Sequence, residues 1–315
     1  MLHIPDTKSI SPYEKVVNCG LSETLSKAKA LRTSADDLRK SLVSYLLKEK
    51  KADQAHAVES CGSFLMFKQY KDAMNTSTLE RANFCKHPLC PLCAWRRHLK
   101  YNAILERSLP LTRGKLSHLV LAIPNSAQLS RADLMRLKER GKSFIKQKLG
   151  CDSYILNLEI VASERGYHPH LHILLESACY FKVTAQWIKD MASKWKKHYI
   201  KGFKDNPYSD YDGFTFYITG IKSDDIAGVC QELTKYIIKG QQKISSEMVE
   251  ETAEAIYKVR KMSSGGMLRE NMQAGKRLTA LALDEKLESL SRHEWEYHIY
   301  QFINGNYERK FNTDD

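Results

Sequence analysis

Long apolar runs are absent from this 315-residue sequence, whose mean hydropathy is −0.46. No window approaches the roughly 18 apolar residues that a membrane span needs. Residues 1–12 lack a basic stretch followed by an apolar one, so we expect no secretory signal. The sequence also has no internal repeat. Transmembrane, secreted and collagen-like classes are therefore excluded, and the expected location is the cytoplasm.

Acidic residues are in deficit. The chain has 37 Asp and Glu against 49 Lys and Arg, which gives a net charge of +12 and an isoelectric point near 9.2. The surplus is concentrated at 81–115, with 8 basic residues and one acid, and at 182–204, with 7 lysines and one acid. A charge of this size favours a polyanionic partner, and we expect nucleic acid rather than membrane.

The 8 cysteines do not form the even framework of a small disulfide-bonded protein. Cys85, Cys90 and Cys93 cluster, and Cys61 lies upstream. Three thiolates with a fourth ligand, either Cys61 or His87, are typical of a structural zinc site. Basic residues follow directly, and phosphate contacts dominate the affinity of DNA-binding modules, so we expect DNA contacts from Arg96, Arg97 and Lys100.

Apolar patterns from residue 119 onward predict alternating strands and helices. Strands are expected at 119–123, 155–163, 167–175 and 213–221, and helices at 127–149, 183–200, 224–239 and 247–261. This order predicts an α+β fold around an antiparallel-rich sheet, close to the ferredoxin-like split unit. Helices are also expected in 21–50 and 278–303, the latter as packing or a dimerisation surface. Residues 263–266 are expected to form a linker.

The most informative segment is the strand at 167–175. Alternate residues of a strand share a face, so His168, His170 and His172 point one way, and Leu171, Ile173 and Leu175 point the other way, toward the core. In the preceding strand, Glu159 lies on the polar face. If Arg165 and Gly166 form a two-residue hairpin loop, Glu159 lies opposite His172. A longer loop would move Glu159 away from His172, and Glu164 would then be the candidate carboxylate. One carboxylate beside two or three imidazoles predicts a divalent-metal site with open positions.

The segment 231–239 is expected to be helical. Glu232 and Tyr236 are four residues apart and Lys239 is three further on, so one helix face would carry a carboxylate, a phenol and a cation. A tyrosine hydroxyl is a weak nucleophile unless a base, a cation or a metal assists it. In the basic helix expected at 183–200, Lys196 and Lys197 are candidates for contacts with the DNA backbone. The alternative is that these lysines only form a solvated helix face. For Trp187, Trp195 and Tyr199 we favour packing over base stacking.

Three motifs in order resemble plasmid rolling-circle replication initiators of the HUH endonuclease superfamily, single-stranded-DNA plasmid group. Leu119–Asn125 resembles the first motif, with fewer hydroxyl residues than is usual. His168–His172 resembles the metal motif, and Lys235–Lys239 the third. The cysteine segment is covered as well, so the resemblance spans about residues 61–240 and favours Cys61 as the fourth zinc ligand.

The resemblance implies a fold, a mechanism and partners. The fold would be a ferredoxin-like HUH palm with flanking helices, divided as an N-terminal helical segment 1–56, a zinc-binding module 57–113, a catalytic domain 114–245 and a C-terminal helical segment 246–315. His170, His172 and Glu159 would hold Mg²⁺ or Mn²⁺, with His168 as an alternative third ligand. Tyr236 would attack one phosphate to give a 5′-phosphotyrosyl link, and Glu232 would position a water or act as base.

The implied partners are the plasmid double-strand origin with a single-stranded or hairpin nick site, and host helicase and polymerase, in a bacterial cytoplasm. A homodimer stays open. The alternative functions are an HUH transposase or relaxase, and a zinc-binding DNA regulator that is not an enzyme.

Overall fold

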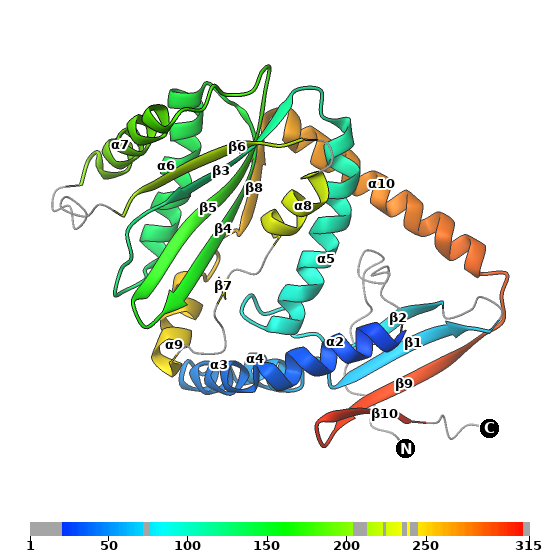
Figure 1. Cartoon of the computed structure of the whole chain (residues 1–315). Coiled ribbons are helices and arrows are strands. Elements are labelled where there is room, and N and C mark those ends of the chain that lie inside the picture. The colour runs from blue at the N-terminus through cyan, green and yellow to red at the C-terminus, as the bar shows by residue number, and fades with distance from the viewer. Residues whose placement is uncertain are drawn as a thin grey trace. The chain divides into compact units, whose positions relative to one another are not determined.

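The computed structural model describes residues 21–71, 76–203, 213–222, 225–234, 238–239 and 245–310. The chain is a mixed α+β protein that forms two compact units (Figure 1), one from residues up to 100 and from 277 onward, and one from residues 101–276. We call them unit 1 and unit 2. The division falls inside α5 (Pro91–Ser108) and α10 (Gly266–Leu290), so it does not coincide with the predicted boundaries at 56, 113 and 245. No helix in the described ranges is long and apolar enough to span a membrane.

Unit 1 contains a four-stranded antiparallel sheet and the N-terminal helices. The strands run in the order β10-β9-β1-β2, with β1 at Phe64–Tyr70, β2 at Ser77–Ala82, β9 at Trp295–Ile303 and β10 at Asn306–Lys310. The helices are α2 (Leu21–Ser34), α3 (Asp36–Lys48), α4 (Ala52–Glu59) and the first half of α5. The helices expected at 21–50 are therefore confirmed, and the buried Leu38, Leu42 and Leu46 form the apolar face of α3.

The expected helix at 278–303 is correct only up to Leu290 and wrong beyond it. Residues 295–303 form β9, which pairs with β1 along its whole length. Tryptophan, tyrosine, isoleucine and phenylalanine dominate this segment, and such residues fit a pleated, half-buried surface better than a helix. The spacing of Trp295, Ile299 and Phe302, four and then three residues, fits the helical period, so the apolar pattern alone favoured the wrong element.

Unit 2 is built on a sheet with the strand order β6-β3-β5-β4-β7, and β8 pairs with β4 beside this path. The strands are β3 (Lys115–Ala122), β4 (Ser153–Ser163), β5 (Gly166–Ser177), β6 (Thr215–Gly220), β7 (Ile238–Lys239) and β8 (Met262–Gly265). The first four are mutually antiparallel where they pair, and β7 runs parallel to β4. The strands predicted at 119–123, 155–163, 167–175 and 213–221 are thus confirmed.

One face of this sheet is covered by α6 (Arg131–Leu149) and α7 (Ala185–Ile200). The α6 helix begins at the cap Ser130, whose hydroxyl accepts from the Asp133 amide, and ends at Gly150, which has φ of 65°. Gly141 of α6 lies against Leu171, and Trp195 of α7 donates from Nε1 to the Ala122 carbonyl at 2.8 Å. The odd-numbered leucines of β5 therefore enter this core.

Among the described residues, helices cover the opposite face of the unit 2 sheet at one end. There α8 (Ile226–Thr234) places Cys230 and Leu233 in a core cluster with Ile155 and Leu174. Burial raises the pKa of the Cys230 thiol to about 12. The histidines of β5 lie on this face, next to the cluster, because Leu174 and His172 have the same parity along the strand.

Two other predicted elements differ from the structure. The helix expected at 247–261 ends earlier, as α9 (Ser246–Ala255). Residues 263–266 are not a linker: Ser263, Ser264 and Gly265 belong to β8, which pairs with residues 154–156 of β4. Pairing with a preformed edge strand overrides the weak intrinsic strand preference of serine and glycine, a tertiary effect that local composition does not reveal.

Candidate metal centres and DNA-facing residues

The metal-ligating side chains of β4 and β5 converge on the partly covered face of the unit 2 sheet. Glu159 Oε2 lies 2.9 Å from His172 Nε2 and 3.4 Å from His170 Nε2. All three side chains are buried, and their ligand atoms lie within 4.8 Å of one another. The sequence prediction that Glu159, His170 and His172 come together is therefore met by the geometry.

The predicted register of this hairpin was wrong, because the two-residue loop lies one residue earlier in the chain than expected. The turn consists of Glu164 and Arg165, and Ser163 pairs with Gly166, so Glu159 lies opposite His170 rather than His172. Gly166 has φ of 89°, and a Cβ there would lie 2.3 Å from the Ser126 carbonyl oxygen, which explains why glycine stands at this strand start. Glu159 still reaches His172 along the diagonal of the face.

The residue that lies opposite His172 is Asn157. Its side chain is fully buried, and neither its amide nitrogen nor its amide oxygen has a hydrogen-bond partner in the described structure. Burying an amide without a partner costs free energy. An amide, a carboxylate and two imidazoles in one buried group fit a divalent cation with bound water, because imidazole nitrogen suits transition metals, and carboxylate, carbonyl and water oxygens suit hard divalent cations.

His168 lies outside this group of three. It is half-buried, pairs with Val161, and its ring centroid is 5.4 Å from that of His170. Burial and the neighbouring His170 lower the pKa of His168. The His170 Nδ1 atom is 3.1 Å from the His168 carbonyl oxygen, which orients the His170 ring with Nε2 toward Glu159.

A further histidine that contacts this group, His118 of β3, was not predicted from the sequence. His118 Nε2 lies 3.1 Å from His172 Nδ1, and the ring planes differ by 11°. The centroid separation of 5.2 Å is close to the N···N distance plus the two ring radii, so the rings meet edge to edge in a hydrogen bond. Strand alternation in 118–122 would have placed His118, Val120 and Ala122 on one face and the core residues Leu119 and Leu121 on the other. This alternation was the signal that could have identified His118.

The segment 231–239 was predicted as one helix, and this is wrong for residues 238 and 239. The α8 helix ends at Thr234, and Lys239 belongs to β7, where it pairs with Val161. Lys239 therefore does not share a helix face with Glu232, which lies within α8. Tyr236 lies outside the described residues. The β-branched Ile238 suits the strand β7, which pairs with β4.

In unit 1 the four predicted cysteines converge. Cys61 Sγ lies 3.6 Å from Cys93 Sγ and 3.5 Å from Cys90 Sγ, and Cys85 Sγ lies 3.6 Å from Cys93 Sγ. These distances exclude disulfides, whose sulfur atoms are about 2.05 Å apart. They are close to the roughly 3.8 Å edges of a tetrahedron with metal–sulfur bonds of about 2.3 Å, so the set fits a structural zinc ion.

Backbone amides support these sulfur atoms. The amides of Cys85, Lys86 and His87 donate to the sulfur atoms of Cys61, Cys93 and Cys85 at 3.2–3.4 Å. Lys86 has φ of 61°, which turns this loop around the cluster. Hydrogen bonds from the other three thiols hold the pKa of Cys90 well below its usual range.

His87 was the alternative fourth ligand, and it lies outside the group of four sulfur atoms. Its Nδ1 accepts from the Leu89 amide at 3.2 Å, and burial lowers the pKa of His87 to about 4. The geometry therefore favours Cys61.

Two of the three predicted DNA contacts of unit 1, Arg96 and Arg97, make contacts within the protein. Arg96 is only 6% exposed, and its guanidinium lies 4.4 Å above the Phe84 ring, so it is not offered to a phosphate. Arg97 donates to the carbonyls of Lys86, His87 and Pro88 at 2.8–3.2 Å and so braces the cysteine loop. Contacts to DNA from Lys100 stay a prediction.

The predicted basic helix of unit 2 is α7. Lys197 is exposed and Lys196 is half-buried, and DNA contacts from both stay a prediction. Trp195 and Tyr199 are fully buried, and Trp187 packs edge-on against Phe216 at 5.5 Å. The packing interpretation of these aromatics is confirmed.

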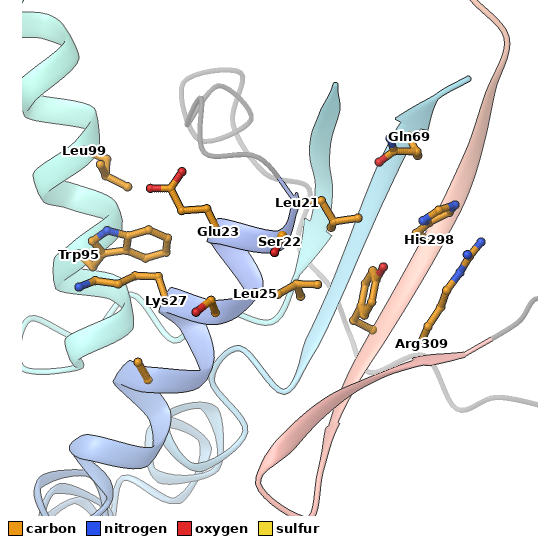
Figure 2. Close-up of a pocket in the computed structure, with 13 residues that line it drawn as sticks. Leu21, Ser22, Glu23, Leu25, Lys27, Gln69, Trp95, Leu99, His298 and Arg309 are labelled. Atoms are coloured by element: carbon orange, nitrogen blue, oxygen red, sulfur yellow. The ribbon is translucent and has the colours of Figure 1, made fainter. Parts of the chain in front are cut away.

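Unit 1 also contains a groove of about 1220 Å³ (Figure 2). Side chains from α2 and α5 face those of the sheet across it, with Trp95 and Lys27 on the helical side and His298 and Arg309 on the sheet side. No residue predicted from the sequence as a ligand, nucleophile or DNA contact lines it.

Comparisons with known proteins agree with the motifs. The family model described as "Replication protein" matches residues 76–307. Curated relatives named "Protein rep" include one from Lactiplantibacillus plantarum, 26% identical over 70% of this chain and 74% of that protein. Another, from Lentilactobacillus hilgardii, is 27% identical over 69% and 74%, and one from Streptococcus pneumoniae is 25% identical over 68% and 69%. No solved structure matches the chain. The chain therefore belongs to the replication protein family, the initiators of plasmid rolling-circle replication.

Proposed function

We propose that this replication initiator is a site-specific single-strand DNA endonuclease and ligase, which nicks the plasmid origin through a 5′-phosphotyrosyl intermediate and later rejoins the ends. The observation that carries the proposal is the convergence of Glu159, His170 and His172 on one sheet face with ligand atoms within 4.8 Å. The family membership supports the initiator role, and the side chains support the chemistry.

The catalytic domain would be a ferredoxin-like HUH palm. The strand order β6-β3-β5-β4, with α6 and α7 in the two crossovers and both on one face, supports this assignment. Such a sheet leaves its other face for the site, and that is the face that carries the histidines.

Glu159, His170 and His172 would hold Mg²⁺ or Mn²⁺. A bound divalent cation polarises a phosphodiester and stabilises the charge of the leaving oxygen. His118 would hold His172 with its Nε2 toward the cation by accepting the proton on Nδ1. The buried amide of Asn157 would bond to a cation-bound water or to a phosphate oxygen.

Tyr236 would be the nucleophile. Its phenolic oxygen would form a bond to the scissile phosphorus, the P–O3′ bond would break, and the strand would leave as a free 3′-OH that primes synthesis. The described neighbours support this: Leu233 packs with Ile155 and Leu174, and residue 238 pairs with Ile160 of β4. Both flanks of Tyr236 thus lie against the elements that carry Glu159 and His172.

Glu232 and Lys239 would assist Tyr236. A cationic Lys239 near the phenol would favour its ionised form, and Glu232 would position a water or remove its proton when the covalent link is hydrolysed at the end of the cycle. Because the phosphoester bond energy is kept in the tyrosyl link, rejoining would need no nucleotide cofactor.

The four cysteines would bind one structural Zn²⁺. This module, together with Lys100, Lys196 and Lys197, would bind the double-strand origin. Host helicase and polymerase would then act on the exposed 3′ end. A second copy of the chain at the origin is part of the same proposal.

The test uses single-stranded oligonucleotides that tile the DNA carrying the gene, labelled at either end and incubated with Mn²⁺. The proposal expects a covalent adduct that carries only the 3′-labelled fragment, because the phosphate stays on the 5′ end of that fragment. Tyr236→Phe and Glu159→Gln should abolish the adduct, and the matched surface variant Tyr257→Phe should retain it. An adduct of equal yield in Tyr236→Phe, or no cleavage of any oligonucleotide with Mn²⁺ or Mg²⁺, would contradict the proposal.

A further inference from the structure

The sheet face that carries the metal-ligating residues continues past them to β6. Tyr217 of β6 pairs with Val120, and Val120 pairs with His172, so these three residues form one row across three strands. Directly paired residues of antiparallel strands project from the same face. Tyr217 therefore stands on the same face as the candidate metal ligands.

Tyr217 is a large aromatic residue that the fold leaves more than half exposed. It is 54% exposed, while its neighbours Phe216 and Ile218 point to the other face and are buried. The residues on either side of Tyr217 on this face are Thr215 and Thr219, both exposed. This corner of the face therefore combines an aromatic ring with two hydroxyl groups.

The distance from Tyr217 to the candidate metal site suits a nucleic acid strand. Two strand spacings of about 4.8 Å separate Tyr217 from His172, or about 10 Å in all. Bases in a stacked strand rise by about 3.4 Å each, so a base over Tyr217 would be within about three nucleotides of a phosphate at the metal ligands.

The charge around β6 suits a polyanion. The α7 helix packs against β6 from the other face, through Trp187 and Phe216, and it carries the exposed Lys194 and Lys197. Backbone phosphates that pass around the sheet edge at β6 would approach this basic helix, whereas a neutral or cationic ligand would gain nothing from its charge.

We propose that Tyr217 is a base-stacking platform for single-stranded DNA and holds a nucleotide that flanks the scissile phosphate. The proposal rests on the proposed function for the identity of that phosphate. Aromatic stacking tolerates every base, because each base has a π-face, so Tyr217 would set the path of the strand rather than its sequence.

The test is the binding of a fluorescein-labelled oligothymidylate to the full chain at low salt, measured by anisotropy. Tyr217→Thr removes the ring but keeps a residue that favours strands, and Tyr217→Trp keeps a ring. We expect Tyr217→Thr to weaken binding about 5- to 150-fold and Tyr217→Trp to bind within about twofold of the unchanged chain. The control is Tyr257→Thr, because Tyr257 is 55% exposed and lies on no strand of the sheet, and it should bind like the unchanged chain.

Tyr217→Thr binding within twofold of the unchanged chain would overturn the proposal, as would an equal loss in Tyr257→Thr. Thermal unfolding of each variant shows whether a loss of binding comes from misfolding. If Tyr217→Thr is misfolded, Tyr217→Trp decides the question, because binding within about twofold is expected only if an aromatic ring at this position suffices. Because oligothymidylate binding requires no cleavage, this result is independent of the proposed nicking activity. In a cleaved oligonucleotide, 5-iodouracil placed within three positions of the nick should crosslink to the peptide that contains Tyr217, and a crosslink only elsewhere would contradict it.

Discussion

Replacement of His118 tests whether the affinity of the proposed site for a divalent cation depends on a residue outside the three proposed ligands. His118 Nε2 lies 3.1 Å from His172 Nδ1. In the proposed cation-bound state this hydrogen bond would hold the proton of His172 on Nδ1 and leave the Nε2 lone pair for the cation. His118→Leu removes the acceptor and leaves His172 free to rotate or change tautomer. Outer partners of metal-ligating histidines contribute about 10- to 100-fold to metal affinity. We expect a loss of that size, about 1.4–2.7 kcal/mol, for Mn²⁺.

The assay is Mn²⁺ titration followed by the electron paramagnetic resonance signal of the free ion. His118→Gln is the matched variant, because its amide oxygen can reach the position of Nε2 and accept the same proton, and it should recover most of the affinity. The metal-free melting temperatures of both variants show whether the fold is intact. An affinity for Mn²⁺ that is unchanged within twofold in His118→Leu, or equally reduced in Leu and Gln variants, would refute the reasoning.

Three further predictions concern the structure around the sites. Cys93→Ser should reduce bound zinc from about one ion per chain to none and should lower the melting temperature. The zinc content is measured by atomic emission after gel filtration. The control Cys179→Ser, which changes an exposed thiol outside the cluster, should alter neither quantity. Burial lowers the pKa of Lys138 to about 8, so the unfolded chain binds more protons between about pH 8 and 10.4 and stability should rise with pH across that window. Lys138→Met, which also removes the hydrogen bond from Lys138 Nζ to the Arg260 carbonyl, should abolish this rise when urea unfolding is measured across that window; an unchanged pH profile would contradict it. Gly141→Ala would place a Cβ 2.4 Å from Leu171 Cδ1 and should cost about 1–3 kcal/mol, while Gly228→Ala, which meets no atom within 4 Å, should be neutral or stabilising.

The candidate site could be predicted from the sequence where local periodicity decides the outcome. Strand alternation fixes which side chains of 167–175 share a face, so the convergence of His170 and His172 followed from the sequence alone. The cysteine spacing likewise constrains three of the four thiols to one loop and helix start. Both inferences use residues that are close together along the chain.

What depends on tertiary pairing could not be predicted in the same way. The hairpin register depended on one assumption about the loop, and a shift of the turn moved Glu159 from His172 to His170. His118 reaches His172 only because β3 pairs with β5, which are 54 residues apart at that contact. Arg96 and Arg97 looked like a basic surface, but the fold directs one onto Phe84 and the other onto loop carbonyls.

The most direct measurement is peptide mapping of the protein–DNA adduct formed on a cleaved oligonucleotide with Mn²⁺. After digestion by protease and nuclease, mass spectrometry should find the residual nucleotide on the phenolic oxygen of the single tyrosine in the peptide 235–239. A nucleotide attached to any other side chain, or cleavage that leaves no covalent link at any stage, would contradict the central claim that a phenol and the Glu159, His170 and His172 group act on the same phosphate.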